Sequence, residues 1–105
     1  MNKIIRGTTP SIKFTFKTIR TSDITAAYLT VKNKDTGTVV LDKDLTAANV
    51  TTGAISWQLS QTETLAWNTG EIFRAMLNWK TSDGLRGSSE KIYWIMDDND
   101  KNEVI

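Results

Sequence analysis

The strongest constraint on the fold of this chain is an alternation of apolar and polar residues with a period of two. The alternation runs through residues 11–17, 24–32, 54–59 and 71–80, and turns rich in Gly, Asp and Asn separate these segments. Successive side chains of a β-strand point to opposite faces, so the pattern indicates strands with one buried face. Some seven short strands with almost no helix are typical of two packed antiparallel sheets. We therefore expect an all-β, immunoglobulin-like antiparallel sandwich of about seven strands, with a small β-barrel as the alternative.

One short helical turn interrupts the strands. Ser60 and Glu63 have the spacing of a capping box, and the segment 68–70 ends the helical run after one or two turns. Such a crossing suits the connection between two sheets. The length of 105 residues matches one domain, so we expect residues 1–105 to form a single sandwich whose acidic end, 97–105, frays.

The chain contains no histidine and no cysteine, which removes the usual general base, the thiol nucleophile and the commonest zinc ligands. No phosphate-binding glycine motif is present. The run from Asp98 to Asn102 begins like a calcium loop, but Glu103 stands where that loop requires glycine, and we interpret the run as a solvated tail. We predict no catalytic, cofactor-binding or metal-ligating residues, and no enzymatic activity.

The charges argue against two classes of partner. Thirteen basic and twelve acidic residues are mixed along the chain and give a net charge of +1, without the basic stripe of a nucleic-acid-binding protein. No segment approaches the ~20 apolar residues of a membrane span, and the N-terminus lacks the apolar stretch of a signal peptide. We expect synthesis in the cytoplasm, and binding neither to nucleic acid nor to a membrane.

Two places are candidates for contact with a partner. Residues 2–6 form a predicted short edge strand, where Ile4, Ile5 and Arg6 are the candidate contact residues, because an unpaired edge can recruit a strand from a neighbour. Trp67 closes the helical turn next to Asn68, and we expect it to be exposed. The other tryptophans lie in alternating strands and are predicted to pack in the core, namely Trp57, Trp79 and Trp94.

Three segments together carry a family resemblance. They are the bend Ile5–Pro10 with the alternating strand after it, the crossing Leu59–Leu65, and the turn Ser82–Gly84 followed by a last strand and the acidic end Asn102–Ile105. This combination resembles small structural proteins encoded by phages and prophages of Gram-positive bacteria. It is also similar to the N-terminal domain of phage baseplate upper proteins, which are linked to receptor-binding proteins at the tail tip.

The resemblance implies a non-enzymatic virion component, a structural or adaptor protein of the tail or baseplate that binds other virion proteins or forms a homo-oligomer. Its location would be the virion after synthesis in the host cytoplasm. Two other functions stay open. One is a carbohydrate-binding module for cell-wall glycans, which requires exposed tryptophan faces. The other is a small phage-encoded inhibitor of a host protein.

Overall fold

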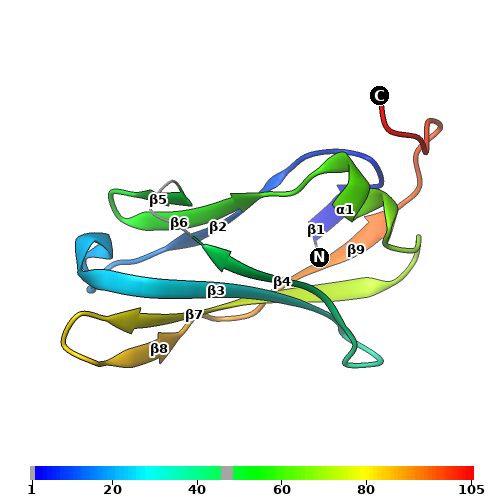
Figure 1. Cartoon of the computed structure of the whole chain (residues 1–105). Helices are drawn as coiled ribbons and strands as arrows, with labels where there is room; N and C mark the ends of the chain where they lie inside the picture. Colours follow the sequence, from blue (N-terminus) through cyan, green and yellow to red (C-terminus); the bar gives the residue numbers. More distant parts are fainter. Residues whose placement is uncertain (1, 46–48) are drawn as a thin grey trace.

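The computed structural model describes residues 2–45 and 49–105, which form two β-sheets of six and three strands packed face to face (Figure 1). Neither sheet closes on itself, so the predicted sandwich is confirmed and the barrel alternative is excluded. The molecule is elongated, with principal extents of 47, 29 and 20 Å.

The larger sheet is ordered β1-β9-β7-β3-β4, and β8 pairs with β7 beyond the end of β9. Its strands are Asn2–Ile5 (β1), Ile24–Asn33 (β3), Val39–Leu45 (β4), Ile72–Thr81 (β7), Arg86–Ser88 (β8) and Ile92–Asp97 (β9). The smaller sheet is ordered β2-β6-β5 and consists of Ser11–Thr15 (β2), Val50–Thr51 (β5) and Ala54–Gln58 (β6). In the immunoglobulin scheme β2, β6 and β5 take the places of strands B, E and D, while β3, β7 and β9 take those of C, F and G.

The structure differs from the predicted sandwich in two details. The larger sheet is mixed, because β1 runs parallel to β9, with Asn2 opposite Trp94 and Ile5 opposite Asp97. The described residues also form nine strands and not about seven. The additional strands include β5 and β8, which have two and three residues and are too short to show alternation.

The core lies between the inward faces of the two sheets. The apolar residues of β3 and β7 that alternation predicts to be buried do face the core. The ends of β7 and β9 near α1 contribute the aromatic rings of Phe73 and Trp94. The buried apolar residues are Ile12, Phe14, Ala27, Leu29, Val31, Leu41, Leu45, Ala54, Ile55, Leu59, Trp67, Phe73, Ala75, Leu77, Trp94 and Met96. Burial of these side chains is the main favourable term that holds the two sheets together in the absence of disulfides.

The short helix α1 (Gln61–Leu65) connects β6 of the smaller sheet to β7 of the larger one. The hydroxyl of Ser60 accepts a hydrogen bond from the Glu63 amide at 3.0 Å, and the Glu63 carboxylate accepts one from the Ser60 amide at 2.8 Å. The predicted capping box is therefore confirmed. A 3-10 turn, η1 (Thr21–Asp23), lies in the connection between β2 and β3.

The strand that returns after the β7–β8 turn is broken. Ser88 pairs with Asn78 and Ile92 pairs with Ala75, so the returning strand contains one residue more than β7 over this stretch. The extra residue forms a bulge in the returning strand. Gly87 lies under the indole of Trp79, and a Cβ on Gly87 would be only 2.4 Å from that ring.

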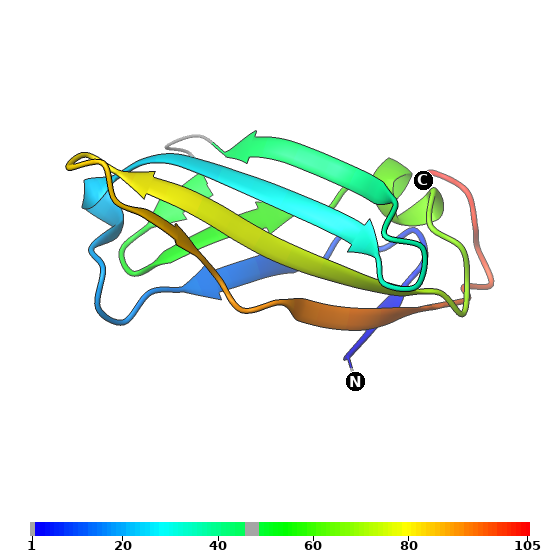
Figure 2. The ribbon, with the colours of Figure 1, turned by 90° about the horizontal axis from the view of Figure 1, so that it is seen from below.

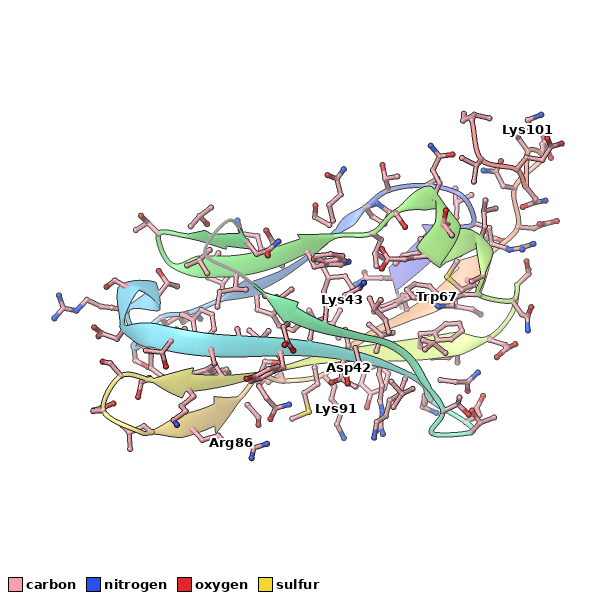
Figure 3. The ribbon with its side chains drawn as sticks, viewed as in Figure 1. Asp42, Lys43, Trp67, Arg86, Lys91 and Lys101 are labelled. Carbon is pink, nitrogen blue, oxygen red and sulfur yellow. The ribbon has the colours of Figure 1, made fainter. Side chains whose placement is uncertain are left out.

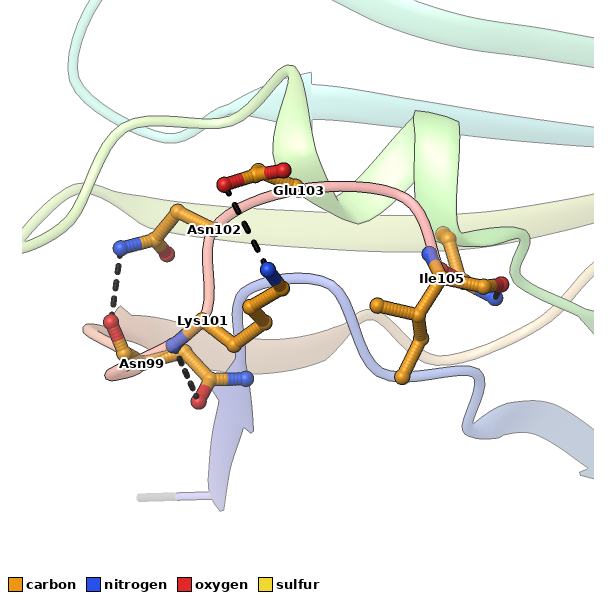
Figure 4. Close-up of polar contacts among 6 residues, drawn as sticks. Asn99, Lys101, Asn102, Glu103 and Ile105 are labelled. Carbon is orange, nitrogen blue, oxygen red and sulfur yellow. Dashed lines mark hydrogen bonds and ion pairs between the residues drawn. The ribbon is translucent and has the colours of Figure 1, made fainter.

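The acidic end of the chain folds back towards α1 (Figure 4). The side-chain amide of Gln61 forms two hydrogen bonds with the backbone of Ile105, donating to its carbonyl at 3.0 Å and accepting from its amide at 2.7 Å. Asn99 donates to the carbonyl of Arg6 at 2.8 Å and accepts from the amide of Lys101 at 3.3 Å. The tail is thus tied to both α1 and the end of β1.

Candidate functional site

Trp67 is not a surface residue. Only 3% of it is exposed, so the prediction that it is available to a partner is wrong. Its ring stacks on Phe73 with a centroid distance of 5.2 Å and lies 5.8 Å from the ring of Trp94. Figure 3 shows Trp67 between α1 and the larger sheet. The indole therefore joins the helical crossing to the core.

Of the predicted contact residues in β1, only Ile5 presents its side chain to solvent, with 44% exposed. Ile4 faces inwards and packs against the core. Arg6 is half-buried, and its guanidinium donates to the carbonyl of Leu65 at 2.7 Å. The edge itself is confirmed, because in the described structure β1 is the last strand of its sheet and pairs only with β9.

The end of the molecule next to β1 is organised around the buried hydroxyl of Thr64. This oxygen donates to the carbonyl of Thr8 at 2.9 Å and accepts from the amide of Gly7 at 3.0 Å. Gly7 has a φ of 82°, a conformation that glycine adopts without strain. The bend, α1 and the acidic tail are distant in the sequence, yet they meet here (Figure 1). Their contacts bind these segments to each other, so this end serves to stabilise the sandwich.

The side of the larger sheet that faces away from the core offers an extended surface, which we call the outer face. Register places its residues in rows across the neighbouring strands. The central members are Tyr28, Thr30, Lys32, Ile72, Arg74, Met76, Asn78, Tyr93 and Ile95. In the middle of the sheet, basic side chains therefore lie next to apolar and polar ones. Aromatic residues, methionine and arginine are enriched in protein interfaces, so this composition favours a protein partner.

Two cations stand side by side at the centre of the outer face. Lys32 on β3 and Arg74 on β7 are directly opposite in the register, and both are half-buried. Among the described residues neither has a carboxylate within 4.0 Å, because the ion pairs lie elsewhere, for example Lys3 with Asp97. Like charges in directly opposed positions destabilise a sheet, so this arrangement is unfavourable unless a partner supplies acidic groups.

A hollow of about 160 Å³ lies beside these cations and is lined by Thr30, Lys32, Arg74, Met76, Asn78 and Lys91. Lys91 and Arg86 project from the same side of the sheet in Figure 3. The nearest acid on β4, Asp42, accepts a hydrogen bond from Thr30 at 3.4 Å. The surface is thus shallow and basic, with a methionine in its floor.

Sequence reasoning missed this surface. Alternation does place Lys32 and Arg74 on the polar faces of their strands. It does not show that they are neighbours, because that depends on the pairing of strands about 40 residues apart. The only signal in the sequence is that the polar face of each strand carries a basic residue, Lys32 in β3 and Arg74 in β7.

Within residues 2–45 and 49–105, no three carboxylate, histidine or cysteine side chains gather as a metal site would require. The same part of the chain has no helix whose length and apolarity would carry it across a membrane. No known protein-family model matches the chain, and no curated protein sequence is significantly similar to it.

Proposed function

We propose that this chain is a non-catalytic adaptor that binds neighbouring proteins through the outer face of its larger sheet. In the setting that the sequence resemblance implies, the neighbours are virion proteins of a phage tail or baseplate. The proposal is supported by one observation above all. Lys32 and Arg74 are opposed among half-buried apolar side chains and have no carboxylate partner within the part of the chain that the structure describes. A partner with acidic groups on a complementary surface would relieve their repulsion and cover the apolar residues.

The size of the outer face suits such a contact. The outward residues of β7 from Ile72 to Lys80 extend over about 27 Å, and the strands from β9 to β4 add about 15 Å of width between their axes. The product is a projected area of roughly 400 Å². The side chains and the rim of the face add further area that a partner would bury. A standard interface buries about 800 Å² on each partner, so the outer face forms a large part of one.

The tryptophans do not favour the carbohydrate-binding alternative. Trp67 and Trp94 are 3% and 2% exposed and offer no face to a sugar. Trp57 has the ammonium of Lys43 over its ring at 5.6 Å. The rings of Trp79 and Phe16 pack at 89° to each other with a centroid distance of 4.9 Å. Because these rings already have partners, binding to another protein explains the surface better than stacking on glycans.

The proposal is tested by quantitative mass spectrometry of purified particles of a phage that encodes this chain. We expect the chain to occur in the particles at a constant ratio to the tail proteins. A high-salt wash should remove the chain from disrupted particles but not from intact ones. Its absence from particles would refute the virion role. Capture of a host protein by the free chain, together with that absence, would support the inhibitor alternative.

A further inference from the structure

The strand β2 has a free backbone edge. Among the strands of residues 2–45 and 49–105 it pairs with β6 alone. The amide of Phe16 donates to the carbonyl of Gly53, which fixes the alternation of hydrogen bonds along the strand. The backbone N–H and C=O groups that face β6 are therefore those of the even-numbered residues. The amides and carbonyls of Ser11, Lys13 and Thr15 point away from β6, and no described residue pairs with them.

The other sheet edges are less able to accept a strand. The edge β4 carries Asp42, Lys43 and Asp44 in succession and has an irregular register, features that discourage pairing. The edge β5 has two residues only. In β1 the carbonyl of Ile5 is already bonded to the amide and hydroxyl of Thr8. The free edge of β2 extends over about 14 Å, enough for four or five residues of a partner.

A groove runs beside this edge, between β2 and the line of β8 and β9. Figure 2 shows β2 and this line along the same long side of the molecule. The groove consists of two adjoining hollows of about 440 and 320 Å³, which share Lys13 and Ile92 in their walls. Its apolar lining includes Phe16, Trp79 and Ile92, all partly buried. The free backbone edge of β2 thus adjoins an apolar groove.

We infer that the edge of β2 binds an extended acidic segment of another protein, which adds a strand to the smaller sheet. Every second side chain of such a strand would point into the groove, towards Phe16 and Ile92, and these positions suit apolar residues. The intervening side chains would lie on the solvent face next to Lys13 and Lys17, neither of which has a carboxylate partner among the described residues. The chemistry recognised is therefore a segment that alternates apolar and acidic residues.

A second copy of this chain does not fit the site as well. If two β2 strands paired edge to edge, the lysines at positions 13 and 17 of one copy would lie near those of the other. Like charges in neighbouring strands oppose such pairing. The inference concerns a surface separate from the outer face and does not depend on the proposed function. If both hold, an adaptor would contact two neighbours at once.

The test attaches a probe segment of alternating valine and aspartate to the N-terminus through a flexible Gly/Ser linker. Asn2 lies in the wall of the groove, so the linker raises the local concentration of the segment there. We expect amide hydrogen exchange of Ser11, Lys13 and Thr15 to slow at least about tenfold, because these amides gain partners. A segment of alternating valine and lysine should leave their exchange unchanged.

Charge exchange gives the matched control. The double substitution Lys13→Glu and Lys17→Glu should abolish the protection by the aspartate segment and create protection by the lysine segment, whereas Lys80→Glu on the outer face should change neither. Far-ultraviolet circular dichroism of each variant establishes that the sandwich is folded. The inference is overturned if the aspartate segment protects none of the three amides, or if the two segments protect them equally.

Discussion

Lys32 and Arg74 lie directly opposite each other on β3 and β7, and no carboxylate among the described residues lies within 4.0 Å of either. A directly opposed pair of like charges costs a sheet up to about 1 kcal/mol. The other central residues of the outer face are half-buried except Tyr28, so the repulsion is a local feature of this surface. This relationship underlies the proposed role in binding acidic partners.

The substitution Lys32→Glu should stabilise the isolated domain. A glutamate opposite Arg74 replaces repulsion with attraction, and we expect the free energy of unfolding to rise by about 0.2–1 kcal/mol. Urea denaturation monitored by tryptophan fluorescence measures this change. The exposed substitution Lys17→Glu serves as the control, with an expected change below about 0.5 kcal/mol. A destabilised Lys32→Glu variant would show that the two cations do not repel each other in the free protein.

Removing the hydroxyl of Thr64 should destabilise the end of the molecule next to β1. The substitution Thr64→Val preserves the shape of the side chain but leaves the Gly7 amide and the Thr8 carbonyl without their partner. We expect a loss of about 1–3 kcal/mol in the free energy of unfolding. Thr62→Val, an exposed position on the same helix, should have little effect. Equal losses in the two variants would contradict the bridging role.

Trp67 should behave as a core residue. The substitution Trp67→Ala removes the stack on Phe73 and the contact with Trp94, and should cost about 3–5 kcal/mol. Thermal unfolding followed by circular dichroism measures the loss. Leu85→Ala, at a position that is 66% exposed, should leave the midpoint almost unchanged. A Trp67→Ala variant as stable as the parent would mean that the ring lies on the surface.

The turn after β7 contains Asp83, whose carboxyl group has a lowered pKa. The hydroxyl of Thr81 donates to the carboxylate of Asp83 and holds its pKa below the ordinary value of 3.8. Because the folded-state pKa is depressed, the resulting stability is present above the ordinary pKa and is lost as the pH falls through the folded-state pKa. In the variant Thr81→Val the pKa of Asp83, measured by nuclear magnetic resonance, should rise towards 3.8. An unchanged pKa would assign the shift to the backbone of the turn.

Local signals predicted much of the fold. Alternation identified the inward faces of β3 and β7, and the spacing of Ser60 and Glu63 identified the start of α1. These features depend on residues close together in the sequence, so they can be inferred without knowing the strand pairing.

Features that depend on distant pairings were missed or mistaken. Trp67 ends a short helix next to polar residues, which is a local pattern typical of exposure. Its burial results from Phe73 and Trp94 on the neighbouring strands, which no local pattern shows. The parallel pairing of β1 and the opposition of Lys32 and Arg74 are register properties of the same kind. The candidate surface therefore required the assembled sheet.

The central claim is that the outer face attaches this domain to other proteins of a virion. The double substitution Lys32→Glu and Arg74→Glu reverses the charge of the face but keeps two like charges opposed, so the fold experiences a similar repulsion. Mass spectrometry of particles assembled with each variant measures incorporation. We expect the parent chain and Lys101→Glu, an exposed change in the tail, at equal levels, and the folded double variant at least about tenfold lower. Incorporation of the double variant at the level of the parent chain would contradict the claim.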